Sequence, residues 1–194
     1  MITSAPTRAP ETRCLLLLDL MVRLVDRFHD ASLLANWVRA RDAARTAGIP
    51  VIYVRIAFRK GYPEVALRNE LLGPIVASGG LGEADTASAI HSLVATGSDD
   101  IVVTKRRVSG FAGSDLDVIL RGLGVETVVL AGLVTSGVVL STLVEAVDRD
   151  FRVVVLSDGC ADADADLHRA LMERYFPSRG RVLTTAEWES ELQP

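Results

Sequence analysis

The fold is decided by the stretch Val128-Val129-Leu130-Ala131-Gly132-Leu133-Val134-Thr135-Ser136-Gly137-Val138. Its first four residues form an uninterrupted apolar run, which is typical of a strand buried on both faces of a parallel sheet. The residues from Gly132 to Val138 predict a turn, and a helix is expected to start within it, from Ser136 onward. A strand, a turn and a helix in this order form the repeating unit of α/β sheets.

The same alternation extends over most of the chain. Apolar runs predict further strands at 14–18, 51–54, 101–103, 153–156 and 182–183, and helical spacing predicts helices at 31–47, 116–123, 138–147 and 166–175. Six strands alternating with helices predict a three-layer α/β/α fold around a six-stranded, mostly parallel, Rossmann-like sheet. The segment 57–98 is less regular. Its Gly79-Gly80-Leu81-Gly82 does not follow a strand, which excludes the dinucleotide-binding fingerprint.

Length and composition limit the class of protein. With 194 residues, of which 49% are hydrophobic and 24% charged, the chain has the size of one α/β domain with a substantial core. We therefore expect a single domain over residues 1–194, with residues 1–12 as a flexible N-terminal extension. The formal net charge of −4, without a long block of either sign, excludes a nucleic-acid partner.

Location is predicted from what the sequence lacks. No apolar run approaches the roughly 20 residues that span a bilayer, so we expect no membrane partner. The two cysteines, Cys14 and Cys160, are far apart and give neither a disulfide framework nor the spacing of a metal site. A reducing cytoplasm is the simplest location for such a chain.

Two ionisable residues stand where parallel sheets collect their reactive groups, beyond the carboxyl ends of strands. Asp19 follows the strand at 14–18, and Lys105 follows the strand that begins at Ile101. A carboxylate at the end of an all-leucine run is partly desolvated, and a lysine beside it holds it ionised, so the pair suits proton transfer. Structural roles stay open: Asp19 as the cap of a backbone turn, and Lys105 as a solvated cation beside Arg106 and Arg107.

Taken together and in order, six elements of the chain resemble the isochorismatase-like, or cysteine hydrolase, superfamily over most of its length. They are Asp19 after an apolar strand, Thr104-Lys105-Arg106-Arg107-Val108-Ser109-Gly110-Phe111, Gly113-Ser114-Asp115-Leu116, Gly132-Leu133-Val134-Thr135, Leu156-Ser157-Asp158-Gly159-Cys160-Ala161 and Leu167-His168-Arg169-Ala170-Leu171. The resemblance implies that Asp19 is the general base and that Lys105 supports it electrostatically. It also implies a small-molecule substrate and a homo-oligomer, either a dimer or a tetramer.

The chain departs from that superfamily at the nucleophile. The superfamily carries a cysteine three residues after the turn threonine, and this chain has Val138 there. Valine has no nucleophilic atom, so a thiol-dependent amidase mechanism is disfavoured. Cys14 is expected to be a core residue, whereas a reactive role for Cys160 stays open. Ser136 is expected to cap the helix, and Ser141 to lie one turn inside it.

Other parts of the turn do not depend on a thiol. The resemblance implies a cis peptide at Leu133-Val134 and an oxyanion hole formed by the backbone N–H groups of Val134 and Val138. The helix that starts at this turn also directs its positive end toward a bound anion.

The resemblance further suggests where a substrate is bound. We expect Phe111, Thr135, Arg55 and Phe58 to contact it, although a solvated loop stays open for the last two. No cofactor is expected. No metal is expected either, because 55–62 contains no histidine, and the isolated His29, His91 and His168 are interpreted as surface or packing residues.

Two functions of different classes remain. The first is a hydrolase for a small metabolite, in which Asp19 and Lys105 perform acid–base chemistry and water, or the substrate itself, replaces the thiol. The isochorismatases proper, which hydrolyse a vinyl ether, set a precedent; they use a glutamine where this chain has Met21. The second is an inactive member that binds or regulates through a small molecule. That Val138 is an engineered change is a third possibility.

Overall fold

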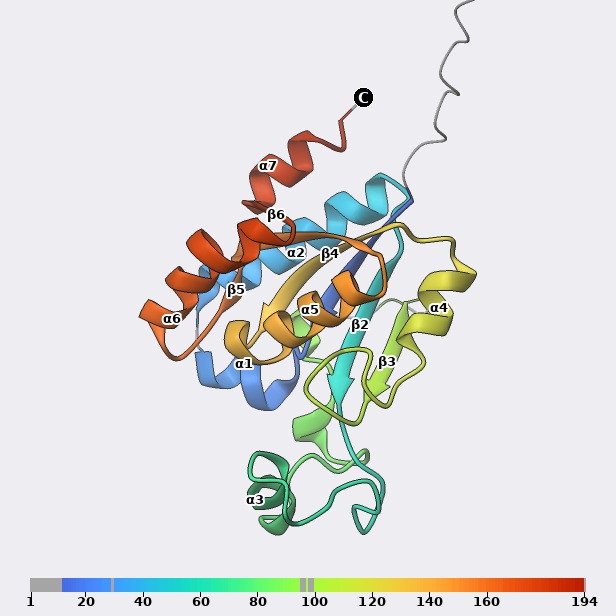
Figure 1. Cartoon of the computed structure of the whole chain (residues 1–194), viewed down its shortest axis with the longest axis vertical. Helices are drawn as coiled ribbons and strands as arrows, with labels where there is room; N and C mark the ends of the chain where they lie inside the picture. Colours follow the sequence, from blue (N-terminus) through green and yellow to red (C-terminus); the bar gives the residue numbers. More distant parts are fainter. Residues whose placement is uncertain (1–11, 29, 95–96, 98–99, 194) are drawn as a thin grey trace, which may run out of the picture.

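Six parallel strands form the centre of the protein (Figure 1). The computed structural model describes residues 12–28, 30–94, 97 and 100–193. The strands are β1 (Arg13–Leu18), β2 (Val51–Ile56), β3 (Ile101–Lys105), β4 (Thr127–Leu133), β5 (Arg152–Ala161) and β6 (Arg181–Leu183). They lie in the order β3-β2-β1-β4-β5-β6, and every pair of neighbouring strands is parallel. The predicted six-stranded sheet is thus confirmed.

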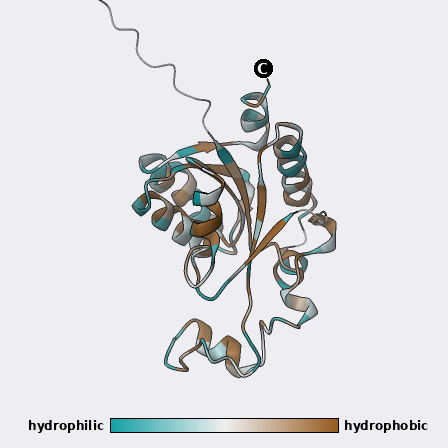
Figure 2. Cartoon of the chain, turned by 90° about the vertical axis from the view of Figure 1, so that its right-hand side faces the viewer, coloured by the Kyte–Doolittle hydropathy of each residue, from teal (hydrophilic) through white to brown (hydrophobic). Residues whose placement is uncertain are grey.

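Helices cover both faces of the sheet, which Figure 2 shows edge-on with its apolar strands between them. They are α1 (Val22–Phe28), α2 (Ala31–Thr46), α3 (Leu72–Ala77), α4 (Leu116–Gly122), α5 (Leu140–Asp148), α6 (Ala165–Ala170) and α7 (Thr185–Ser190). Successive side chains of β1 point to opposite faces of the sheet and so contribute to two cores. Leu16 packs toward α4 and α5, whereas Leu17 packs toward α2 and α7. The three-layer α/β/α arrangement is therefore confirmed.

The sheet winds outward in two directions from its centre. The chain passes from β1 to β2 and β3 on one side, and from β4 to β5 and β6 on the other. Loops beyond β1 and β4 therefore diverge and leave a crevice at the carboxyl ends of these strands. Gly132 allows the two strands to approach there, because a Cβ at this position would lie 2.1 Å from the carbonyl oxygen of Leu18.

Several element boundaries differ from those predicted. The helix expected at 138–147 begins earlier, with a π-helical turn at Thr135–Val139 that continues into α5. Likewise, α6 is followed by a π-helical turn at Leu171–Tyr175. Neither α1 nor α3 was predicted, because both are short: α1 has seven residues, of which Leu24, Val25 and Phe28 pack against the core without being fully buried, and α3 has six.

At the N-terminal side, the expected extension lies mostly outside the described residues, which begin at Thr12. Thr12 itself belongs to the folded part, because its carbonyl accepts hydrogen bonds from the backbone N–H groups of Glu126 (2.9 Å) and Thr127 (3.1 Å). No helix within the described part of the chain is both long enough and apolar enough to cross a bilayer.

Candidate active site

Asp19 and Lys105 form a buried ion pair at the carboxyl edge of the sheet. Lys105 Nζ lies 2.9 Å from Asp19 Oδ2 and also donates to the carbonyls of Arg107 (3.1 Å) and Val108 (2.8 Å). Lys105 is the last residue of β3, and Asp19 follows β1 with a left-handed backbone (φ 54). Non-glycine residues rarely adopt this conformation, and such strain concentrates at functional sites.

Burial sets the electrostatics of the pair. Lys105 is 1% exposed and Asp19 6%. Burial raises the pKa of the Asp19 carboxyl; Lys105 and the backbone N–H of Ile56 lower it, and the net direction is upward. Asp19 Oδ1 is buried and has no hydrogen-bond partner among the described residues. One oxygen of the carboxylate is thus held by the lysine, and the other is left for a ligand or water.

A cavity of about 260 Å³ opens over this pair. Asp19, Lys105 and the turn beyond β4 form its floor, and Val138 lines it with 2% of its surface exposed. The walls are mostly apolar and come from α1 and from the segment around α3. They consist of Met21, Arg23, Leu24, Arg27, Ile56, Leu71, Leu72, Ile75, Leu81 and Val108. The structure thus brings Asp19, Lys105, Val134 and Val138 together in one cavity.

The turn beyond β4 is held by its own backbone and by a neighbouring strand. The Leu133–Val134 peptide is cis, and the N–H groups of Gly137 (3.1 Å) and Val139 (3.3 Å) donate to the Val134 carbonyl. Ser136 does not cap the helix as expected. The helix begins earlier, at Thr135, and the Ser136 N–H instead donates to Asp162 Oδ2 at 2.7 Å. The cap therefore comes from the residue that follows β5.

His168 is partly buried, in keeping with its interpretation as a surface or packing residue. Its Nδ1 lies 2.9 Å from the hydroxyl of Thr135, which is fully buried and does not itself line the cavity. Burial lowers the pKa of His168, and Asp162 opposes this shift. The contact between the two residues was not predicted from the sequence, although Thr135 was expected to bind the substrate. The only signal was that His168 sits in the helix after β5, whose carboxyl end lies beside the turn.

None of the four residues expected to bind the substrate lines this cavity: besides Thr135, the other three also lie elsewhere. Arg55 donates instead to Thr104 Oγ1 and to the Ser88 carbonyl, both at 3.2 Å, because strand alternation turns it away from the side of Ile56. Phe58 is fully buried and packs among apolar residues beneath α3. Phe111 stacks on Phe151, with 5.9 Å between ring centroids, in the core under α4 and α5.

Neither cysteine is placed to act as a nucleophile. Burial raises the pKa of Cys14 to about 12, as expected for a core residue. Burial also raises the pKa of Cys160 to about 12, although a backbone hydrogen bond at Gly132 works in the other direction. Cys160 pairs with Gly132 across β4 and β5 and does not line the cavity. Both thiols therefore stay protonated near neutral pH.

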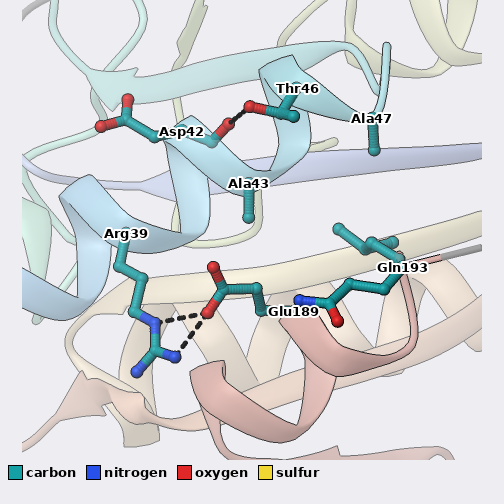
Figure 3. A pocket seen from close by; sticks show the side chains of 8 residues that line it. Arg39, Asp42, Ala43, Thr46, Ala47, Glu189 and Gln193 are labelled. Carbon is teal, nitrogen blue, oxygen red and sulfur yellow. Dashed lines mark hydrogen bonds and ion pairs between the residues drawn. The ribbon is translucent and has the colours of Figure 1, made fainter.

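A larger hollow of about 520 Å³ lies elsewhere, between α2 and α7 (Figure 3). Arg39 pairs with Glu189 across it, with 2.5 Å between Nη2 and Oε2. The hollow shares no residue with the Asp19 cavity, and it adjoins the last turns of α2, which lead to the amino end of β2. Size alone does not locate chemistry here, because reactive groups gather at the opposite edge of the sheet.

Metal-binding side chains are not grouped in the described residues: no three of His, Cys, Asp or Glu are arranged to hold an ion there. His29 lies outside those residues. His91 contacts Asp26, with 3.2 Å between Nε2 and Oδ1.

Comparison with known proteins fits this arrangement. The profile of the isochorismatase domain matches residues 13–187. The chain belongs to the isochorismatase family. The resemblance seen in the sequence is confirmed, and the match spans every strand of the sheet and the aspartate, lysine and turn at its edge.

Relatives within the family differ in what their names describe. An uncharacterized isochorismatase family protein of Bacillus subtilis, YwoC, is 30% identical, covering 92% of this chain and 93% of the relative. A probable inactive nicotinamidase of Arabidopsis thaliana is 30% identical, covering 83% of each chain. The crystal structure of a cysteine hydrolase from Pseudomonas syringae pv. phaseolicola superposes with a TM-score of 0.86 at 27% identity, covering 95% of both chains.

Proposed function

We propose that this isochorismatase-family chain hydrolyses a small metabolite by acid–base chemistry at Asp19 and Lys105, without a covalent intermediate. The observation that carries the proposal is the state of the Asp19 carboxylate. One oxygen is held 2.9 Å from Lys105 Nζ, and the other is buried and has no hydrogen-bond partner in the described part of the chain. A proton acceptor prepared in this way suits the activation of a water molecule.

The proposed reaction is direct hydrolysis of an acyl group. Asp19 takes a proton from water as the water oxygen bonds to the carbonyl carbon, whose π electrons move to the carbonyl oxygen. The N–H groups of Val134 and Val138 stabilise this oxyanion. When the carbonyl re-forms, the bond to the leaving group breaks, and Asp19 returns its proton to that group. Lys105 keeps the carboxylate ionised between turnovers.

Val138 supports water as the nucleophile. Its side chain lines the cavity beside the pair and offers no atom that could form an acyl-enzyme. Cys160 is buried away from the cavity, and its thiol stays protonated. Water is the nucleophile that remains.

The test is turnover by Asp19→Asn across a panel of amides, ureides and vinyl ethers. We expect the wild type to hydrolyse at least one, and the variant to lose about 10²-fold or more in kcat/KM. Asp26→Asn is the matched control, because Asp26 is exposed on α1 and does not line the cavity. An unchanged kcat/KM in a folded Asp19→Asn variant would disprove the acid–base role of Asp19.

A second candidate is a binding or regulatory protein that has lost turnover. Val138 favours it, as does the similarity to a relative named as a probable inactive nicotinamidase. A ligand that binds tightly and emerges unaltered after long incubation would establish this alternative. Recovery of hydrolysed product would reject it.

Several expectations stay predictions beside these proposals: a single domain over residues 1–194, a dimer or tetramer, and a cytoplasmic location. Sedimentation of the purified chain would decide the second.

A further inference from the structure

The cavity above Asp19 carries net positive charge. Four of its described lining residues are ionisable: Asp19, Lys105, Arg23 and Arg27. The aspartate and the lysine form an ion pair and offset each other. The two arginines are left over, and a guanidinium stays protonated at any physiological pH. An anionic ligand would therefore be favoured over a neutral or cationic one.

The arginines lie together on α1 and lack protein counter-charges. They are four residues apart, so they project from the same side of the helix. Within the part of the chain that the structure describes, no carboxylate forms an ion pair with either guanidinium. Asp26, the acidic residue between them, is engaged by His91. Two like charges at this spacing destabilise a helix slightly, and a bound anion would remove that cost.

One guanidinium lies against the loop that follows α3. A Cβ placed on Gly80 would lie 2.7 Å from Arg23 Nη1, so Arg23 lies directly against the backbone of the loop after α3. A glycine at position 80 leaves the room that this side chain occupies. The exposed side chain of Arg23 thus extends from α1 to that loop, at the wall of the cavity.

The remaining wall residues favour a ligand that has an apolar body. Leu71, Leu72, Ile75 and Leu81 face the cavity from the segment around α3, opposite the floor that carries Asp19. Leu71 is 58% exposed, so its side chain is accessible to a ligand in the cavity. The cavity volume of about 260 Å³ limits the occupant to a small molecule.

We propose that Arg23 and Arg27 bind the anionic group of the ligand, and that the ligand class is a small amphipathic oxyanion, a carboxylate or a phosphate monoester. Its apolar body would lie against the leucines of the α3 segment, and its reactive group would face Asp19. Guanidinium groups match the planar, paired oxygens of such anions. The inference rests on the proposed function only in placing the reacting group at Asp19.

Binding of three probes of similar shape tests this assignment: benzoate, phenyl phosphate and the neutral benzyl alcohol. Titration by NMR or calorimetry at low salt should show that at least one anion binds more tightly than the alcohol. Arg23→Gln and Arg27→Gln should each weaken that anion about fivefold and leave the alcohol unchanged. Added salt should weaken the anion alone. Arg169→Gln, on exposed α6 and paired with Asp166, is the matched control and should change nothing.

Three results would overturn the assignment: neither anion binds, both bind no better than benzyl alcohol, or the two arginine variants bind the anion as the wild type does. Which anion binds decides between carboxylate and phosphate monoester. Because binding is measured without turnover, this test is separate from that of the proposed function. Asp19→Asn can abolish hydrolysis while the arginine variants leave anion binding intact, or the reverse.

Discussion

Lys105 reaches Asp19 across an intervening strand: β2 separates β3 from β1, yet the two charged atoms are 2.9 Å apart. The contact is possible because all three strands end at the same edge of the sheet, and the left-handed backbone of Asp19 turns the chain away just beyond β1. An ion pair in this position joins the ends of β1 and β3 across β2. Its removal should therefore affect both stability and chemistry.

We expect Lys105→Met to destabilise the fold in a pH-dependent way. An uncompensated buried charge costs about 3–5 kcal/mol, so the free energy of unfolding should fall by this order at pH 8. Without Lys105, the pKa of Asp19 in the folded protein lies further above its unfolded value. The penalty is therefore full above the folded pKa and disappears once the pH falls below the unfolded pKa, near 4. Urea unfolding at several pH values measures this.

The double variant Asp19→Asn with Lys105→Met is the control for that experiment, because it leaves no charge behind. It should recover much of the lost stability at pH 8 and show little of the pH dependence. A single Lys105→Met variant that is equally stable at pH 8 and pH 5 would contradict the buried-pair account.

The pH dependence of hydrolysis should report the raised pKa of Asp19. As a base, Asp19 acts only when ionised, so kcat/KM should rise with pH through its pKa. Burial raises that pKa, so the acid limb should lie above the usual carboxyl value of about 3.9. Lys105→Met removes the cation that lowers the pKa and should move the limb to higher pH. A limb that stays in place in this variant would show that another group titrates.

Labelling with iodoacetamide should distinguish the two buried native thiols from a thiol introduced at the nucleophile position. Because the pKa of both Cys14 and Cys160 is raised to about 12, the folded wild type should resist modification at pH 8 and react only when unfolded. Val138→Cys places a thiol in the cavity wall and should take up one label per chain. Rapid labelling of Cys160 in the folded wild type would reopen its role.

Asp162→Ala should loosen the helix start at the turn. The side chain accepts a hydrogen bond from the Ser136 N–H at 2.7 Å, and loss of such a cap costs about 0.5–2 kcal/mol. Burial raises the pKa of Asp162, but its hydrogen bonds outweigh this and lower it. The stabilisation is therefore present at pH 7 and is lost as the pH falls below about 4. Thermal unfolding at pH 7 and pH 3 should show a shrinking difference between the variant and the wild type.

Asp166→Ala is the control for the cap, since Asp166 is exposed on α6 and forms an ion pair with Arg169 rather than a contact with the turn. It should change stability little at either pH. An equal loss in both variants would show that the Ser136 contact contributes nothing specific.

The sequence was sufficient for the strands and for the pair at their ends. A buried parallel strand leaves a continuous apolar run, and a charged residue directly after it stands out, as Asp19 does. Lys105 was found in the same way, although the strand extends through it. Such signals can be seen locally in the sequence, and because parallel strands end at the same edge of the sheet, the residues that follow them lie close together.

The walls of the cavity could not be predicted in this way. Arg23 and Arg27 lie on α1, which has only seven residues, so its apolar pattern is too short to predict the helix or its orientation. Phe111 follows the lysine closely in sequence, yet it turns into the core and stacks on Phe151. Contacts such as that of Thr135 with His168 join segments far apart in the chain, and only the folded arrangement of β4 and α6 brings them together.

The two kinds of cavity residue stand on different supports. The acid–base pair is fixed at strand ends in the centre of the sheet. Much of the apolar wall belongs instead to the irregular excursion between β2 and β3, which Figure 1 shows below the sheet around α3. Such a division lets the excursion vary in length and sequence while the pair keeps its geometry. Grafting this excursion between relatives should therefore change substrate preference and leave the reaction at the ion pair unchanged. In this way members of the family can differ in substrate without a change in their catalytic residues.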